Sequence, residues 1–386
     1  MITYENIPVA KVKNITTNII NHSIKINKNI CNKNRIILFD DDVIELENYN
    51  YNILKKIGLG SFSDVFESTM KNIENSENGE NSDNNNQSSV LALKFYKNKT
   101  SYISSAITEI NILEELKNVN IENNIIHCLD YFNLNSHICL VFNKYDMDLY
   151  EYYSSFLKKT LKITKPNFTF VLKSIALGLS FLKTNKIINT DLKPENIFIN
   201  LDQSITMSKK SLYPFKNVVI SDFSSALRMD KPISHYNITS LWYRAPDTYF
   251  QLNNLNFIDI WSFGCILYEV WYAEPLFTIT YDNSFKHIDK DNLLLQNNHI
   301  LKIGYMPPEF IKSNYIKKSL IVPIRFFHSC KQSKYYRKKF ESIPYAEIIQ
   351  KIFIWEPTKR ITPSTLDEII IESAKHITGG ESNKIN

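Results

Sequence analysis

The stretch that decides the fold reads Ile188-Asn189-Thr190-Asp191-Leu192-Lys193-Pro194-Glu195-Asn196-Ile197. It places a carboxylate, a cation and an amide close together, at Asp191, Lys193 and Asn196, and a proline restricts the backbone between them. Apolar runs flank it at 186–188 and 197–199. The pattern predicts a short loop between two buried segments, which would hold the three polar side chains in fixed relative positions over one reacting centre.

A glycine-rich stretch lies upstream, at 58–66, and follows a strand-like segment at 51–57. Glycines at Gly58 and Gly60 let backbone N–H groups approach phosphates without obstruction by a Cβ atom. A phosphate-binding hairpin and a plain hairpin turn both explain this pattern. The stretch taken alone leaves the two interpretations open.

A single lysine, Lys94, stands among apolar residues in the strand-like segment 90–95. A half-buried ammonium group needs an anionic partner, because its desolvation alone is costly. Glu109 opens a segment in which apolar residues recur at helical spacing up to position 116, and this predicts a helix with one buried face. We expect Glu109 to pair with Lys94; the alternative is that both lie on the surface.

A second carboxylate, Asp222, directly follows an apolar strand-like segment at 218–220 and Ser221. If this strand end lies opposite Asn196, the two side chains form a magnesium site. Mg²⁺ prefers hard oxygen ligands and keeps waters and phosphate oxygens as its remaining ligands. The sequence therefore predicts Asn196 and Asp222 as metal ligands.

The order of these motifs resembles the order found in eukaryotic-type protein kinases, from about residue 51 to about residue 370. The positions that carry the resemblance are Gly58, Gly60, Lys94, Glu109, Asp191, Lys193, Asn196, Asp222, Asp247, Asp259 and Arg360. The resemblance implies an α+β bilobal protein-kinase fold, with a small antiparallel β-sheet N-lobe carrying one main helix and a large, mainly helical C-lobe. It also implies an ATP-dependent protein serine/threonine kinase that uses Mg²⁺.

The resemblance further implies individual roles. Asp191 would orient the substrate hydroxyl, Lys193 would meet the transferred phosphate, and Lys94 would position phosphates while Glu109 orients it. The residues expected to bind the nucleotide are Ile57, Gly58, Gly60, Ser61, Ser63, Val65, Ala92, Lys94, Phe142, Asn143, Tyr145, Asp148 and Phe198. Asp148 would reach the ribose, and a helix N-cap is the alternative for it.

Several positions depart from the kinase pattern. Asn189 replaces the usual histidine, Ser63 and Ser224 replace glycines, and Asp247 replaces a glutamate. These departures motivate an alternative function, a pseudokinase that acts as a nucleotide-binding scaffold. A small-molecule kinase is a third candidate. It is disfavoured because 241–247, with an Asp247–Arg360 pair, would build a shelf for a peptide.

Finer resemblances indicate the CMGC group. The segment Thr190 to Asn196 is similar to that of the LAMMER (Cdc-like) kinases, and SR-protein kinases share its Thr-Asp pair. Leu241-Trp242-Tyr243-Arg244 instead resembles cyclin-dependent kinases, and the LAMMER signature Glu-His-Leu-Ala-Met-Met-Glu-Arg is absent from the sequence. The LAMMER/SR-protein kinase branch is the expectation, with Arg/Ser-rich splicing factors as substrates and mRNA splicing as the process.

Thr190 has a consequence for regulation. Most kinases carry arginine before the catalytic aspartate, where it reads an activation-loop phosphate. Without that cation, we expect activity that does not strictly depend on activation-loop phosphorylation. Hydroxyl groups that remain available for modification lie at Ser234, Tyr236, Thr239 and Ser240.

Bulk properties limit the other classes. The 386 residues are 44% hydrophobic, with a net charge of +5 in short clusters, so nucleic-acid binding is not indicated. The five scattered cysteines form no metal or disulfide pattern, which favours a reducing compartment. The sequence shows no signal peptide and no membrane span. We expect an intracellular protein of the cytoplasm or nucleus, a monomer whose partners are ATP and a protein substrate.

The domain organisation follows from these segments. Residues 1–48 are expected to be a partly disordered extension, 51–372 the kinase domain and 373–386 a C-terminal tail. Within the kinase domain, the N-lobe spans 51–142, the hinge 143–148 and the C-lobe 149–372. The Asn-rich stretch 71–89 is polar and of low complexity, which predicts a disordered insert in the N-lobe.

Overall fold

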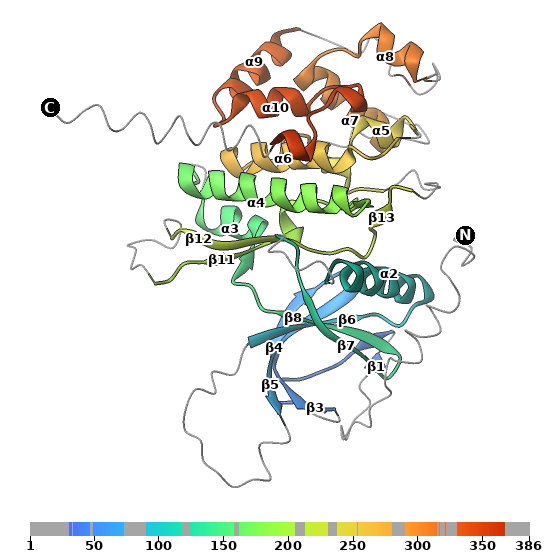
Figure 1. Ribbon diagram of the computed structural model, residues 1–386, viewed down its shortest axis with the longest axis vertical. Helices are drawn as coiled ribbons and strands as arrows, with labels where there is room; N and C mark the ends of the chain where they lie inside the picture. The colour runs from blue at the N-terminus through green and yellow to red at the C-terminus, as the bar shows by residue number, and fades with distance from the viewer. Residues whose placement is uncertain are drawn as a thin grey trace, which may run out of the picture. The chain divides into compact units, whose positions relative to one another are not determined.

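The computed structural model describes residues 31–32, 34–46, 49–72, 90–117, 124–157, 162–204, 213–230, 238–252, 254–279, 290–314, 316, 321 and 330–366. The chain divides into two compact units, Met1–Ile121 with Ile126–Tyr145, and Glu122–Ile125 with Asp146–Asn386. The expected architecture of a sheet-rich N-terminal unit and a mainly helical C-terminal unit is confirmed (Figure 1).

The N-terminal unit contains a six-stranded antiparallel sheet in the order β3-β4-β5-β6-β8-β7 (Figure 1). Its elements are β1 (Cys31–Asn32), β2 (Arg35–Ile36), β3 (Val43–Glu45), β4 (Tyr49–Leu59), β5 (Ser63–Asn72), β6 (Val90–Tyr96), α2 (Thr100–Lys117), β7 (Cys128–Leu134) and β8 (His137–Asn143). Helix α2 packs against β6, β7 and β8.

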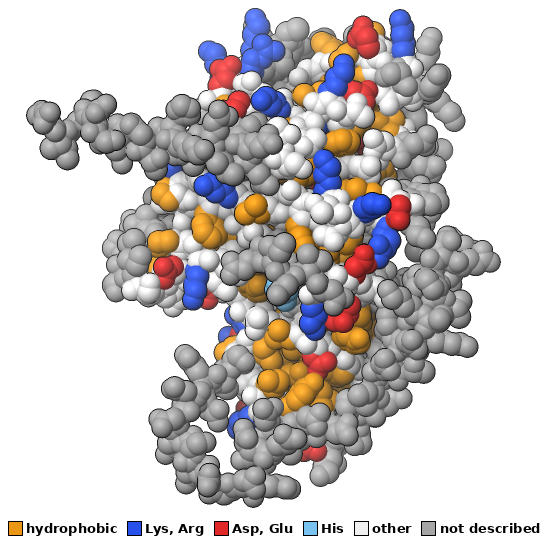
Figure 2. All heavy atoms as spheres, viewed as in Figure 1, with side chains coloured by type: hydrophobic (Ala, Val, Ile, Leu, Met, Phe, Trp, Pro, Cys, Tyr) orange, Lys and Arg blue, Asp and Glu red, His pale blue; other side chains and the backbone are white. Residues whose placement is uncertain are grey.

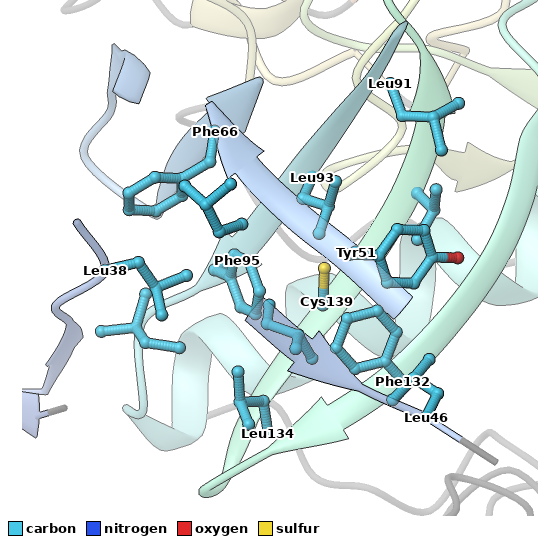
Figure 3. Close-up of a cluster of buried hydrophobic side chains, with 14 residues drawn as sticks. Leu38, Leu46, Tyr51, Phe66, Leu91, Leu93, Phe95, Phe132, Leu134 and Cys139 are labelled. Atoms are coloured by element: carbon cyan, nitrogen blue, oxygen red, sulfur yellow. The ribbon is translucent and has the colours of Figure 1, made fainter. Parts of the chain in front are cut away.

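Along β6, buried side chains on the core face of the sheet alternate with less buried side chains on its opposite face. Leu91, Leu93 and Phe95 are buried, and they point into the hydrophobic cluster of Figure 3. Successive side chains of a strand point to opposite faces. Ala92 and Lys94 therefore lie on the other face, where polar chemistry is possible.

The folded N-terminal unit begins earlier than the predicted start at residue 51. Strand β3 pairs with β4, and Ile36, Leu38, Ile44 and Leu46 belong to the same hydrophobic cluster as β6. The part of the predicted extension from 34 to 46 is thus built into the sheet and its core. The apolar runs of residues 34–46 are short and are interrupted by Asp, so they do not show the alternation that is typical of a strand.

Two further boundaries differ from prediction. Strand β5 runs to Asn72, so the predicted insert 71–89 starts inside a strand, and residues 73–89 lie outside the described residues. Helix α2 begins at Thr100, well before Glu109. Its first turns carry threonine and serine, which have low helix propensity and masked the start.

The C-terminal unit is mainly helical, with two small sheets, β12-β11-β9 and β10-β13. Its elements are β9 (Met147–Asp148), α3 (Leu149–Phe156), α4 (Lys165–Thr184), β10 (Ile187–Ile188), η3 (Pro194–Asn196), β11 (Ile197–Leu201), β12 (Phe215–Ile220), β13 (Leu227–Arg228), η5 (Leu241–Tyr243), α5 (Pro246–Tyr249), α6 (Ile258–Tyr272), α7 (Lys290–Ile303), α8 (Pro308–Ser313), α9 (Cys330–Glu341), α10 (Ala346–Ile352) and η8 (Pro357–Lys359). The 3-10 helices carry the letter η.

Helix α6 is the central element of this unit, because every residue from Ile258 to Trp271 is buried. Helix α4 lies alongside it (Figure 1). The α6 glycine allows close packing: a Cβ atom on Gly264 would lie 2.6 Å from Cγ2 of Ile352 on α10.

One short segment before β7 clusters with the C-terminal unit. The amide of Ile220 donates to the carbonyl of Asn124 (2.8 Å), and Nδ2 of Asn124 donates to the carbonyl of Val218 (3.0 Å). The predicted N-lobe, 51–142, is therefore not one continuous block. The division between Tyr145 and Asp146 falls within the range predicted as the hinge.

The described helices include none that is long and apolar enough to cross a membrane. Figure 2 shows Lys and Arg side chains spread over the visible face and mixed with Asp and Glu. This distribution matches the short charge clusters of the sequence.

Candidate active site

In the N-terminal unit, the ion pair between strand β6 and helix α2 forms as predicted. Nζ of Lys94 lies 2.8 Å and 3.0 Å from the two carboxylate oxygens of Glu109. The Glu109 side chain is 1% exposed and that of Lys94 is 15% exposed. The hydroxyl of Tyr96 also donates to Glu109, at 2.5 Å. The carboxylate is thus anchored, and it fixes the lysine that it pairs with.

The glycine-rich loop is a tight hairpin between β4 and β5. The amide of Gly60 donates to the carbonyl of Ser63 (2.9 Å), and a Cβ atom on Gly60 would lie 3.0 Å from that carbonyl oxygen. A Cβ atom on Gly58 would lie 3.1 Å from Cβ of Val65. Glycine is therefore favoured at both positions by close packing. Ser61 at the tip is exposed, whereas Ser63 is buried as the first residue of β5.

Some of the other nucleotide candidates of this unit share the sheet face of Lys94. Val65 lies opposite Lys94 in the β5–β6 register, and Ala92 lies opposite Phe142 in the β6–β8 register. Directly opposed residues place their side chains on one face. Ile57 and Asn143 are exposed, and Tyr145 is half-buried beyond the end of β8. The sheet thus brings Val65, Ala92 and Lys94 together on one face.

In the C-terminal unit, a buried carboxylate of α6 holds the loop of the opening stretch. The amides of Asn189 and Thr190 donate to the two oxygens of Asp259, at 2.7 Å and 3.0 Å. Burial raises the pKa of Asp259 to about 6, and these two hydrogen bonds partly oppose the shift. Thr190 has φ of 71°, a rare conformation for a β-branched residue. The loop backbone is therefore held in a strained shape by its anchor.

The side chains of Asp191, Lys193 and Asn196 lie together, as the sequence predicts. Nζ of Lys193 lies 2.6 Å from Oδ2 of Asp191. Nδ2 of Asn196 donates to the backbone carbonyl of Asp191 (2.8 Å) and to its Oδ2 (3.3 Å). The side chains of Asp191 and Lys193 are 22% and 23% exposed, so both remain accessible to a substrate.

Asn189 and Thr190 tie this loop to the segment that contains Asp222. Nδ2 of Asn189 donates to the carbonyls of Ser221 (3.3 Å) and Asp222 (3.2 Å), and its Oδ1 accepts from the amide of Asp191 (3.1 Å). The Thr190 hydroxyl donates to the carbonyl of Ser225 (2.9 Å). The side-chain amide of Asn189 therefore links the loop to the segment that contains Asp222. The histidine that is usual at this position has no amide group.

Asn196 and Asp222 meet the requirements of a magnesium site in donor chemistry. The backbone N–H and hydroxyl of Ser221 both donate to the carbonyl of Asn196, at 2.9 Å each, which fixes Asn196 beside the residue preceding Asp222. Because Nδ2 of Asn196 faces Asp191, its Oδ1 is directed elsewhere. An amide oxygen and a carboxylate suit Mg²⁺. The described residues contain no cluster of three or more His, Cys, Asp or Glu suited to a metal.

Ser240 is a residue of this region that the sequence argument missed. Its hydroxyl donates to Oδ1 of Asp191 (2.6 Å), its amide donates to the same oxygen (3.2 Å), and Lys193 donates to the hydroxyl (3.3 Å). From the sequence, Ser240 is expected only as a modification site. The available signal was its place just before Leu241-Trp242-Tyr243-Arg244, the segment expected to meet a peptide. Of the other hydroxyls named with it, Ser234 and Tyr236 lie outside the described residues.

Asp148 caps a helix, as the alternative interpretation proposed. Its Oδ1 accepts from the amide of Glu151 (2.7 Å) at the start of α3. Burial raises the pKa of Asp148 to about 6. Phe198 lies opposite Asp148 in the β9–β11 register and is half-buried. Capping uses one carboxylate oxygen, so the proposed ribose contact stays a prediction.

Two buried arginines organise the segment that follows Ser240. Both side chains of the Arg360–Asp247 pair are 0% exposed, with Nη2 to Oδ2 at 2.7 Å and Nη1 to Oδ1 at 3.1 Å. The shorter carboxylate at 247 thus still forms the expected pair. Nη2 of Arg244 donates to the carbonyl of Thr239 (2.9 Å), a residue with φ of 75°.

The sequence model of the protein kinase domain matches residues 51–371, most of the chain. The chain belongs to the protein kinase domain family. This membership covers both units described above. ATP and Mg²⁺ are general requirements of this family.

Several kinases are similar in sequence. Dual specificity tyrosine-phosphorylation-regulated kinase 2 of Drosophila melanogaster is 27% identical over 351 residues, which cover 84% of this chain and 42% of that protein. Homeodomain-interacting protein kinase 1 of Caenorhabditis elegans is 30% identical over 230 residues, 59% of this chain and 24% of that protein. The chain thus spans less than half the length of these curated relatives. They support the CMGC assignment, and the LAMMER/SR-protein branch stays a prediction.

A solved crystal structure of a kinase domain is similar in fold. It has a TM-score of 0.63 and 22% sequence identity, and the match covers 82% of this chain and 93% of that one. At this identity the likeness concerns the fold. It agrees with the antiparallel sheet and helical unit described above.

Proposed function

We propose that this protein kinase transfers the γ-phosphoryl group of ATP to a serine or threonine hydroxyl of a protein. The observation that carries the proposal is the Asp191 carboxylate, accessible yet fixed on a buried, strained loop. It already accepts a hydrogen bond from a serine hydroxyl, that of Ser240, at 2.6 Å. A substrate hydroxyl has the same chemistry and can take the same position.

Each residue contributes one step. Asp191 orients the attacking hydroxyl and accepts its proton, while Lys193 stabilises negative charge on the transferred group. Lys94, fixed by Glu109, positions the nucleotide phosphates. Asn196 and Asp222 would hold Mg²⁺, which neutralises phosphate charge when bound. Positioning and electrostatic stabilisation supply most of the catalysis in this reaction class.

The Arg244–Thr239 contact supports a preference for proline directly after the phosphorylated residue. A hydroxyl placed at Asp191 puts the next substrate residue beside the segment around Thr239 and Ser240. The Thr239 carbonyl is already occupied by Arg244, so it is a poor acceptor for that residue's N–H. Proline has no N–H to satisfy, so it loses nothing there. Arg/Ser-rich substrates rest on the catalytic-loop resemblance alone.

A peptide comparison tests the substrate proposal. Peptides that differ only in the residue after the acceptor, proline or arginine, are phosphorylated in parallel by the same enzyme. We expect at least a tenfold higher kcat/KM for Ser-Pro. Equal or better use of Ser-Arg would instead support the splicing-factor proposal.

The alternative function is a pseudokinase that binds nucleotide without transfer. The departures at Ser63 and Ser224 favour it, but the polar contacts of Asp191, Lys193 and Lys94 are in place.

We further propose an intracellular location, on the cysteine content of the sequence.

The experiment that tests the function measures phosphoryl transfer and Mg-ATP binding together. Asp191→Asn should lower kcat by about a hundredfold or more and leave ATP affinity nearly unchanged. Asp230→Asn, an exposed carboxylate of the same unit, serves as the control. Full turnover by Asp191→Asn would exclude the proposed role. ATP binding by the wild-type chain without any transfer would favour the pseudokinase.

A further inference from the structure

A buried lysine beside the glycine-rich loop has no role in the function described so far. Lys97 follows β6 directly and is 8% exposed. Its ammonium donates to the carbonyls of Gly60 and Ser61, at 2.6 Å each, and its backbone amide donates to the carbonyl of Phe62 (2.9 Å). One residue thus binds three successive carbonyl groups at the tip of the loop.

These contacts determine where the amides of the loop point. In a planar trans peptide, the C=O of one residue and the N–H of the next point in opposite directions. The described chain contains no cis peptide bond. Because the carbonyls of Gly60 and Ser61 face Lys97, the N–H groups of Ser61 and Phe62 face away from it. Within the described residues, neither N–H donates to a protein acceptor.

The charges around Lys97 explain why it binds carbonyls. The nearby carboxylate of Asp64 already forms ion pairs with Arg35 (3.3 Å) and Lys56 (3.0 Å). Burial and the positive charge of Arg35 lower the pKa of Lys97. Two cations share this one carboxylate, so the loop carbonyls are the acceptors left for Lys97.

A second contact holds the tip of the loop from the side of helix α2. The ring of Phe62 packs edge-on against Tyr102, with centroids 5.2 Å apart. The side chain of Phe62 is 48% exposed, so this contact alone is weakly shielded from water. Lys97 is the buried part of the arrangement.

We propose that Lys97 is a positioning residue for the phosphates of ATP. It holds the loop carbonyls on one side, so that the amides of Ser61 and Phe62 form a ready pair of donors for a phosphate oxygen. Adjacent backbone amides that point the same way bind anions. The proposal rests on the proposed kinase function, since ATP supplies the phosphates. It assigns to one lysine a task usually ascribed to glycine alone.

The test separates phosphate binding from base binding. The affinities of the full chain for Mg-ATP and for adenosine are measured in the wild type, Lys97→Met, Lys97→Arg and Lys55→Met. Lys55 lies on β4 close to the loop, with a side chain that is 61% exposed, so its replacement removes the same charge without touching the loop carbonyls. The ratio of the two affinities is insensitive to a general loss of folded protein.

We expect Lys97→Met to weaken Mg-ATP binding about tenfold and to change adenosine binding less than twofold. Lys97→Arg keeps a cationic donor and should stay within about threefold of the wild type for both ligands. Lys55→Met should be unchanged. Equal losses for ATP and adenosine, no loss in Lys97→Met, or the same loss in Lys55→Met would each overturn the proposal.

Hydrogen exchange without nucleotide tests the same clamp independently of catalysis. The Gly60 amide, which donates to the carbonyl of Ser63, should be more protected in the wild type than in Lys97→Met, whereas exchange in α2 should be the same in both. If the loop exchanges identically in both proteins, the clamp is absent. A wild type that binds ATP but transfers nothing would refute the kinase function and leave this result standing.

Discussion

The two loops that carry the candidate chemistry are held in different ways. The backbone of the loop at 189–196 donates hydrogen bonds to Asp259, a 7% exposed carboxylate of α6. The side chains of Asn189 and Thr190 also bind the segment that contains Asp222. The loop at 58–63 has a single buried anchor among its described contacts, Lys97, on the carbonyl side. One loop is fixed at its amides and the other at its carbonyls.

The two kinds of anchor leave different groups of each loop available to a ligand. Amides bound to Asp259 cannot serve a ligand, so the first loop offers side chains, and it needs rigidity to hold them in place. Amides left open by Lys97 are available, so the second loop offers its backbone. Deep hydrogen-bonded anchors resist opening, whereas exposed hairpins open readily.

Amide hydrogen exchange should differ most between the two loops. The amides of Asn189 and Thr190 donate to a buried carboxylate and should exchange at least a thousandfold more slowly than those of Ser61 and Phe62. Exchange measured by NMR on the nucleotide-free protein checks this. Similar rates in the two loops would remove the contrast.

Breaking one ion pair in each unit should lower the free energy of unfolding by unequal amounts. Arg360→Met leaves Asp247 charged and fully buried, so the free energy of unfolding should fall by about 3–5 kcal/mol. Lys94→Met leaves Glu109 with the hydrogen bond from the Tyr96 hydroxyl, and the loss should be about 1–2 kcal/mol. Denaturant unfolding of both variants gives the comparison. A larger loss for Lys94→Met would contradict the assignment of Arg360 as the structural pair.

A buried glutamate next to the Ser240 segment should make stability depend on pH. Glu269 accepts hydrogen bonds from Tyr153 and from Tyr243 (2.7 Å), and burial raises its pKa to about 7. The folded state therefore holds the proton more tightly, so this contribution to stability is complete below pH 4.5 and is lost as the pH rises through 7.

Glu269→Gln tests this sign directly. Relative to the wild type, the variant should gain about 2 kcal/mol in free energy of unfolding between pH 5 and pH 8. Unfolding in urea at several pH values measures the difference. A flat difference across that range would show that Glu269 titrates normally.

The smallest effect is expected from phosphatase treatment. The Thr190 side chain is buried and donates to Ser225, so this position offers no cation to read an activation-loop phosphate. The activity of purified protein should change by less than about twofold after treatment. The same treatment of a kinase known to require phosphorylation is the control. Loss of activity here would show that another cation reads a phosphate.

Much of the site could be predicted because its chemistry is local in sequence. Asp191, Lys193 and Asn196 lie on one short loop, and Lys94 needed only one partner at helical distance. The Asp247–Arg360 pair followed from the family pattern. Residue type and spacing were sufficient for the loop and for the Lys94 pair, and the Asp247–Arg360 pair needed the resemblance to the family as well.

The rest depends on tertiary contacts that spacing does not encode. Ser240 is 49 residues from Asp191 in the sequence and meets it only in the folded unit. Lys97 meets the glycine-rich loop only once β5 and β6 pair. The strand at 43–45 was missed because Asp residues lie between the apolar positions of this region, and only its pairing with β4 identifies it. Hydrophobic periodicity detects regular elements, not the hydrogen bonds between loops.

A double-mutant cycle tests most directly whether Lys94 and Asp191 serve one phosphoryl-transfer reaction. kcat/KM for a peptide substrate is measured for the wild type, Lys94→Met, Asp191→Asn and the double variant. We expect each single change to cost about a hundredfold or more, and the double variant to be little worse than the poorer single one, since residues that act as a unit are not additive. Full activity in either single variant, or fully multiplied losses in the double variant, would contradict the account.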